Sequence, residues 1–270
     1  MRTGPRSSSG QYKPVRGLIR GVAVLEALNR APGGFATVTE LSRQCAMHRT
    51  TVKRLLESLA DCGYVRHEDQ TGCYWLTDHV QRLSAGRIEE PWVARVAEPL
   101  MRTSVSRLIW PCDLGSPDAG FMAIRASTHG LSGLSQHRAM IGERLPMLVT
   151  AAGRAYLAAC SEPERKAHLA ILKVRTDTWG ELSRDRSYVS RVLRQTRSTG
   201  YGFNHGEWAR EPDFAAVAVS INAGDRVLGA INLVFPKSAI TAIELDRRFL
   251  PGLRRLADEI GRKSLAVLDG

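Results

Sequence analysis

The stretch MHRTTVKRLLESLADCGYV, Met47–Val65, organises the N-terminal part of this chain. Its apolar residues recur three and four positions apart, which predicts a helix with one buried stripe: Val52, Leu55, Leu56 and Leu59. Gly63 is placed to end that helix, because glycine accepts a left-handed backbone. The opposite face is basic or bears hydroxyls, so it suits a major groove as well as it suits solvent.

The residues before this helix decide between those two readings. A first helix is predicted over Leu18–Asn29, with Leu18, Val22, Leu25 and Leu28 inward, and Pro32-Gly33-Gly34 ends it. Thr37-Val-Thr-Glu40 is a capping-box pattern that starts a short helix over Val38–Gln44. Helix, short helix, turn and longer helix is the order of a helix-turn-helix unit.

After Gly63, the stretch Tyr64–Leu76 reads as two extended pieces around a polar turn that contains Gly72. They predict a β-hairpin, and therefore a winged helix-turn-helix. Arg66 and His67 lie where such a wing would meet the DNA backbone, and phosphate contacts position a protein without reading sequence. The predicted DNA-binding residues are His48, Arg49, Thr50, Thr51, Lys53, Arg54, Arg66 and His67.

Composition fits this interpretation. The chain has 270 residues, 43% of them hydrophobic, and a formal net charge of +11, which favours a polyanionic partner without identifying it. The first 84 residues hold 12 Lys and Arg against 7 Asp and Glu, so the basic excess is densest there. Five irregularly spaced cysteines argue for a reducing compartment. There is no secretory h-region and no run of 18 apolar residues, so we expect a soluble cytoplasmic protein without membrane spans.

The order of elements predicts an α+β chain. We expect a disordered tail over residues 1–14, the winged helix over 15–77, a helical linker over 78–91 and a second domain over 92–268. In the second domain, strands are expected at 109–114, 121–126, 131–137, 214–221 and 227–235, with a turn at 115–120. Helices are expected at 151–159, which Thr150 can cap, and at 163–172, 188–196 and 244–267, on the flanks of an antiparallel sheet.

No catalytic constellation can be assembled from the sequence. Nucleotide-binding, nucleophile-elbow and metalloprotease motifs are missing. The Cys and His residues of the N-terminal third lack paired C-x₂-C spacing, so no metal site or cofactor is expected. Cys112-Asp113 with the distant His137 is better read as a strand cysteine acting as a small hydrophobe. We therefore expect no enzyme; the alternative is a metabolite-binding protein or enzyme with a vestigial DNA-binding domain.

Several motifs together carry a family resemblance over nearly the whole chain. The chain closely resembles the IclR-type transcription regulators, on these stretches: Arg16–Gly21, His48–Leu59, Gly63–Val65, Ser135–Pro146, Ala151–Ala155, Gly200–Gly202 and Gly229–Val234. Trp110-Pro111 with His137-Arg138 looks most like the branch that regulates aromatic-acid catabolism, notably activators of hydroxyphenylpropionate pathways.

The resemblance implies a GAF-like effector domain, a homodimer or dimer of dimers on double-stranded DNA with a palindromic operator, and a small carboxylate effector. Alignment to the family's motifs places its pocket positions at His137, Leu145, Ala151, Ala152, Glu207 or Trp208, Ala216, Asn232 and Val234. The last two replace the small polar residues of members that bind small keto acids, which favours a larger, partly apolar effector.

The residues themselves support an aromatic carboxylate. The start of the Ala151 helix offers free N–H groups, and charge could come from His137, Arg138 or Arg125. Trp110 or Trp208 could stack on a ring. Alternation along the predicted strand 131–137 would put His137 and Arg138 on opposite faces, so His137 is favoured for the pocket.

Overall fold

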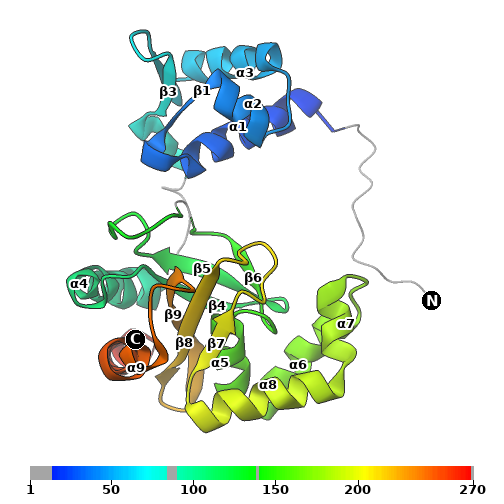
Figure 1. The fold of residues 1–270 in the computed structure, drawn as a ribbon, viewed down its shortest axis with the longest axis vertical. Coiled ribbons are helices and arrows are strands. Elements are labelled where there is room, and N and C mark those ends of the chain that lie inside the picture. Colours follow the sequence, from blue (N-terminus) through cyan, green and yellow to red (C-terminus); the bar gives the residue numbers. More distant parts are fainter. Residues whose placement is uncertain (1–13, 84–89, 138–139, 269–270) are drawn as a thin grey trace. The chain divides into compact units, whose positions relative to one another are not determined.

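The computed structural model describes residues 14–83, 90–137 and 140–268. The chain divides into two compact units, Met1–Ile88 and Glu89–Gly270, each described here by itself (Figure 1). Most of the tail predicted at 1–14, and residues 84–89 of the linker predicted at 78–91, lie outside the described residues. No helix among the described residues is long and apolar enough to cross a membrane.

The first unit packs three helices against a three-stranded sheet of order β1-β3-β2. Its elements are α1 Arg16–Arg30, β1 Phe35–Thr37, α2 Val38–Gln44, α3 Arg49–Asp61, β2 Val65–Glu68 and β3 Cys73–Leu76. Both reciprocal hydrogen bonds of the predicted capping box are present, between Thr37 and Glu40. Gly63 takes φ +79 after α3, and its N–H donates to the Ala60 carbonyl. The predicted winged helix-turn-helix is therefore confirmed.

The prediction for the inner face of α1 was partly wrong. Val24 and Leu28 are buried, but Leu18 is 67% exposed and Val22 is 48% exposed. The buried face of α1 turns away from them because Val24, Ala27 and Leu28 pack on the core around Leu41, Val52 and Leu56.

The second unit is built on a six-stranded antiparallel sheet of order β6-β5-β4-β9-β8-β7. Its strands are β4 Cys112–Asp118, β5 Phe121–Ser127, β6 Arg144–Pro146, β7 Gly202–His205, β8 Phe214–Ala223 and β9 Arg226–Pro236. Its helices are α4 Glu98–Leu108, α5 Ala151–Ala159, α6 Glu162–Lys173, α7 Thr178–Arg184, α8 Arg186–Thr199, α9 Ala242–Glu244 and α10 Leu250–Leu268. The predicted α+β class with a flanked antiparallel sheet is confirmed.

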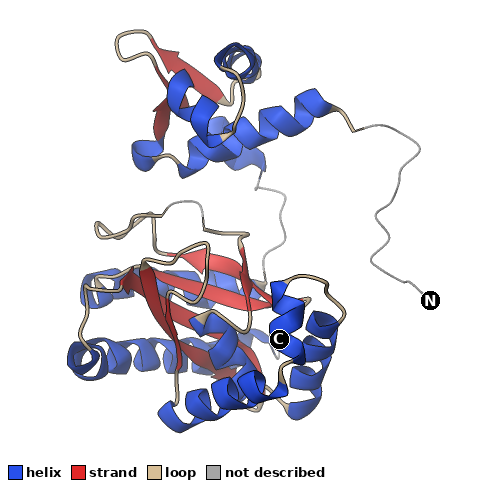
Figure 2. Cartoon of the chain, turned by 45° about the vertical axis from the view of Figure 1, so that its right-hand side comes forward, coloured by secondary structure: helices blue, strands red, loops and turns tan. Residues whose placement is uncertain are grey.

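Two hydrophobic clusters cover the two faces of this sheet, where Figure 2 shows helical layers. Val217, Ile231 and Leu233 face the cluster with α4 and α10. Alternation turns Ala216, Ala218 and Ala230 toward α5. These side chains are small, and Gly202 has none: a Cβ there would lie 2.1 Å from the Ala151 carbonyl oxygen. Small residues thus let the start of α5 approach the sheet.

Two strand predictions in this unit were wrong. Residues 131–137 form turns and loop, because the Leu131 and Ser132 N–H groups donate to the Thr128 carbonyl and the Ser135 N–H donates to the Ser132 carbonyl. The turn expected at 115–120 is shorter, because β4 continues through a β-bulge at Leu114/Gly115 to Asp118. Strands β1, β6 and β7 and helix α7 were not predicted.

Candidate functional site: a DNA-reading face and a ligand cavity

The exposed face of α3 carries the cations and hydroxyls expected of a DNA-reading helix. Arg49, Thr50, Lys53 and Arg54 are exposed, whereas Thr51 is half-buried. His48 is the N-cap of α3: its Nδ1 lies 2.8 Å from Thr50 Oγ1 and accepts from the Thr50 N–H at 3.4 Å. His48 therefore orders the helix start, where a helix presents N–H groups to phosphate.

The two residues of the wing that were predicted to contact DNA, Arg66 and His67, have different surroundings. Arg66 and His67 are neighbours on β2, so they point to opposite faces of the sheet. The Arg66 guanidinium lies 5.0 Å from the Trp75 ring centroid, whereas His67 packs on Tyr74 and its Nδ1 lies 2.9 Å from Asp69 Oδ1. Among the residues that the structure describes, Arg66 has no acidic partner, which makes it the better candidate for a phosphate contact.

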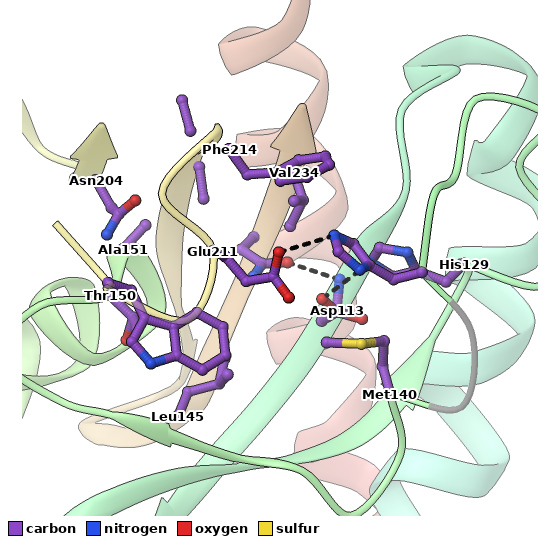
Figure 3. A pocket seen from close by; sticks show the side chains of 15 residues that line it. Asp113, His129, Met140, Leu145, Thr150, Ala151, Asn204, Glu211, Phe214 and Val234 are labelled. Carbon is purple, nitrogen blue, oxygen red and sulfur yellow. Dashed lines mark hydrogen bonds and ion pairs between the residues drawn. The ribbon is translucent and has the colours of Figure 1, made fainter. Parts of the chain in front are cut away.

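The second unit holds a cavity of about 520 Å³, including its mouth, between the sheet and the start of α5 (Figure 3). Part of its wall is apolar or aromatic: Met140, Leu145, Ala151, Trp208, Phe214, Ala215, Ala216 and Val234. The remaining lining is polar: Asp113, His129, His137, Thr150, Asn204, Glu211 and Asn232. This mixture of apolar and polar groups suits a small organic ligand.

One end of the cavity is rich in amide and hydroxyl groups. Thr150 caps α5, its Oγ1 accepting from the Gly153 N–H at 3.4 Å, so the cavity reaches the first turn of that helix. Asn204, on β7, anchors the turn before α5 through its side-chain amide, which donates to the Val149 carbonyl. The positive end of the helix dipole therefore faces the cavity at Ala151.

The other end is formed by titratable groups from β4 and the following loops. Asp113 and His129 are almost fully buried, and His129 Nε2 lies 3.3 Å from Asp113 Oδ2. Nearer the surface, His137 Nε2 lies 3.6 Å from Glu211 Oε2. Burial lowers the pKa of His137, and the facing carboxylate of Glu211 offsets only part of that shift. The described lining contains no lysine or arginine.

The structure brings many of the predicted effector residues together. Those that line the cavity are His137, Leu145, Ala151, Trp208, Ala216, Asn232 and Val234. Arg138 lies outside the described residues. Arg125 is not in the lining; its Nε donates to Ser116 Oγ at 2.8 Å.

Three predicted residues lie outside the lining. Trp110 packs with Phe235 in the hydrophobic cluster of α4 and α10, because the chain enters β4 on that face of the sheet. Ala152 is buried in the cluster under α5. Glu207 accepts at 2.9 Å from the buried Arg154, which also donates to the Leu148 and Phe203 carbonyls. Of the pair Glu207 or Trp208, the cavity therefore includes Trp208.

Sequence reasoning missed eight lining residues: Asp113, His129, Met140, Thr150, Asn204, Glu211, Phe214 and Ala215. The Thr150 cap was read from the sequence but not assigned to the pocket. Cys112, weighed as a nucleophile, is buried, and burial raises the pKa of its thiol, as expected for a small hydrophobe.

A winged helix joined to a domain with a ligand-sized cavity defines a ligand-responsive DNA-binding regulator. The family model of the IclR helix-turn-helix domain matches residues 17–69, and that of the bacterial transcriptional regulator IclR C-terminal domain matches residues 93–262. The chain belongs to the IclR family of DNA-binding transcription regulators with an effector-binding domain.

Individual relatives agree with this assignment. The chain is 27% identical to the Pca regulon regulatory protein of Pseudomonas putida, over 87% of this chain and 79% of the relative. It is also 27% identical to the transcriptional repressor IclR of Escherichia coli K12, over 76% and 80%. An IclR homologue from Microbacterium hydrocarbonoxydans, crystallised with 4-hydroxybenzoate, shares the fold with a TM-score of 0.54 at 21% identity, over 93% of this chain and 99% of that one.

Proposed function

We propose that the cavity binds a small aromatic carboxylate and that this effector controls how the winged helix binds its operator. The supporting observation is the combination of an apolar wall with the start of α5 at one end of the cavity. A ring needs apolar contact, and a carboxylate needs N–H donors and a positive helix end. Relatives point the same way, since the homologue named above was crystallised with 4-hydroxybenzoate.

The carboxylate is proposed to lie at the α5 end, near Ala151, Thr150 and Asn204. At the opposite end it would face Asp113 and Glu211, and like charges repel. The ring would lie along Ala216, Val234 and Leu145, with Trp208 at its edge. The apolar and aromatic part of the lining favours an aromatic effector over a glyoxylate-like one.

The proposed DNA-binding unit is a homodimer that reads a palindromic operator. Arg49, Thr50 and Lys53 would contact or position bases, and Arg54 and Arg66 would hold phosphates. The proposed sign of control is activation of a catabolic operon, which rests on the resemblance to the aromatic-acid branch. In vitro transcription from the protein's own promoter region, with and without effector, tests that sign.

Two measurements test the proposal. In a thermal-shift screen of aromatic carboxylates, at least one acid should raise the melting temperature of the chain, because a ligand that binds only the folded state stabilises it. A rise with short keto acids and with no aromatic acid would overturn the proposed effector class.

Operator binding is tested by titrating DNA at several salt concentrations. The Lys53→Ala and Arg54→Ala variants should bind the protein's own promoter region more weakly, and each lost phosphate contact should lower the salt slope by about 1. Arg43→Ala, on α2, is the control. Equal affinity for promoter and random DNA would contradict a sequence-specific regulator.

A further inference from the structure

Helices α6, α7 and α8 of the second unit enclose a surface groove that shares no lining residue with the effector cavity. Figure 1 shows these three helices together, coloured from green to yellow. The base of the groove is the outer edge of the hydrophobic cluster that contains α5, formed by Leu169, Val189 and Leu193. Val189 and Leu193 are each 8% exposed, and Leu169 is half-buried. The base therefore offers apolar contacts that solvent already reaches.

The rim of the groove is basic. It carries four exposed cations: Lys173, Arg186, Arg194 and Arg197. The described lining contains no aspartate or glutamate. Arg186, Ser190, Arg194 and Arg197 recur three and four positions apart, so they lie on one face of α8. From Arg186 to Arg197 this face runs for about 16 Å, or about three helical turns.

The carboxylates of the same three helices and their caps lie outside this lining. Three of them cap the helix starts: Glu164, Asp177 and Asp185. Glu162 pairs with Lys166 at 2.6 Å, and Glu181 belongs to α7 without lining the groove. The positive charge of the rim is therefore not neutralised by the helices that form it.

This arrangement has a cost for the isolated chain. Like charges three or four positions apart destabilise a helix, and α8 carries Arg191, Arg194 and Arg197 at that spacing with no acidic residue. A partner that brings carboxylates to the rim removes this repulsion. Arginine around an apolar centre is also the composition of strong protein contacts.

We propose that this groove binds an acidic amphipathic helix of a partner protein. An apolar stripe on that helix would lie on Leu169, Val189 and Leu193, and carboxylates on its flanks would meet the rim arginines. This is the helix-in-groove mode of recognition, in which the anchors recur at i, i+3 or i+4 and i+7. The inference does not depend on the effector class proposed above, because the groove and the cavity share no lining residue.

The apolar base decides among anionic partners. A DNA backbone would pair with the arginines, but phosphate and sugar contacts would leave the base without an apolar partner. A membrane surface takes up apolar side chains that protrude into it. Leu169, Val189 and Leu193 instead form the bottom of a groove, which a protruding side chain of the partner can enter.

Fluorescence anisotropy of a labelled peptide with the full chain tests this. The peptide spans about three helical turns, with leucine at i, i+3, i+4 and i+7 and glutamate at the other positions. A scrambled peptide of the same composition should bind at least about tenfold more weakly, because it cannot place its leucines on one face. Replacing every glutamate by lysine should abolish binding.

Two variants of α8 locate the contact. The Arg194 guanidinium has no hydrogen-bond or ion-pair partner within the described part of the chain, so Arg194→Glu reverses the charge without breaking a contact of the fold. It should weaken peptide binding about tenfold or more. Arg191→Glu is the matched control: it lies on the same helix and changes the charge equally, but Arg191 stacks over Tyr188 and is outside the groove. It should keep most of the affinity.

Four outcomes would overturn the inference. The first is no binding of the amphipathic peptide, and the second is equal binding of the scrambled one; neither depends on how a variant folds. The third is an equal loss in Arg191→Glu and Arg194→Glu. The fourth is unchanged peptide binding in Arg194→Glu with weaker binding of random-sequence duplex DNA, which would make the groove a nucleic-acid surface. Each of these leaves the proposed aromatic effector untouched, since the thermal-shift screen tests that separately.

Discussion

At the scale of single residues, Gly153 allows the first turn of α5 to pack against the Met147 backbone, next to the cavity. A Cβ at this position would lie 2.2 Å from the Met147 Cα, a distance that real side chains do not tolerate. Gly153→Ala should therefore lower the free energy of unfolding of the second unit by about 1–3 kcal/mol, the cost of overpacking. Urea denaturation measures this. Gly130→Ala is the matched control, because nothing lies within 4 Å of a Cβ there.

His137 gives a pH-dependent prediction. Burial lowers its pKa, so the folded chain keeps it neutral at pH values where an unfolded histidine, with a pKa of about 6.5, binds a proton. The unfolded state then binds more protons as the pH falls below about 6.5, and the free energy of unfolding decreases there. His137→Gln should show a smaller loss of stability than wild type between pH 7.5 and 5.5 in urea denaturation. An identical loss in both proteins would contradict this, since His168, also shifted downward by burial, is present in both.

The same scale shows what the sequence could and could not predict of the cavity. Alignment to the family's motifs placed Asn232 and Val234 among the pocket positions, and both line the cavity. Asp113 could not be found that way, because its contact with Asn232 spans 119 positions and depends on the β4–β9 register. Trp110 was chosen for its aromatic ring, but the face on which it packs is set by how the chain enters β4.

At the scale of elements, local signals were sufficient where the element carries its own boundaries. The capping box of α2 and the Thr150 cap of α5 fixed where these helices begin, at Val38 and at Ala151. The three residues of β1 have no such signal: they become a strand only by pairing with β3. Likewise β7 exists through its pairing with Ala215–Ala218 of β8.

Helix α1 carries a prediction at this scale. Four apolar side chains repeat along it at helical spacing and are exposed: Val15 69%, Leu18 67%, Ile19 58% and Val22 48%. A contiguous exposed apolar stripe of this kind marks a protein contact, and a twofold homodimer places the same stripe on both subunits. Leu18→Glu should therefore shift the chain from dimer to monomer in size-exclusion chromatography with light scattering.

Arg20→Gln is the control for this test, because it changes the charge of α1 by one unit, as Leu18→Glu does, without removing an apolar side chain. It should leave the mass unchanged. A wild-type chain that is monomeric at micromolar concentration, or a Leu18→Glu variant that stays dimeric, would show that the stripe is not the dimer contact.

At the scale of the whole molecule, regulation requires that the cavity and the winged helix influence each other across two separate compact units. Thermodynamic linkage makes such an influence reciprocal: if the effector changes operator affinity by some factor, the operator changes effector affinity by the same factor. The usual range is about 5- to 150-fold. The two factors are measured independently, by DNA titration with and without a saturating aromatic acid, and by calorimetry of that acid with and without operator DNA.

In the wild-type chain we expect the two factors to agree within experimental error. In a variant that binds the effector but whose operator affinity no longer responds to it, both factors should approach 1. If the effector binds the second unit tightly while both factors equal 1 in the wild-type chain, binding does not regulate operator affinity. The effector would then have to act at a step after DNA binding, and transcription assays at saturating protein would detect that effect.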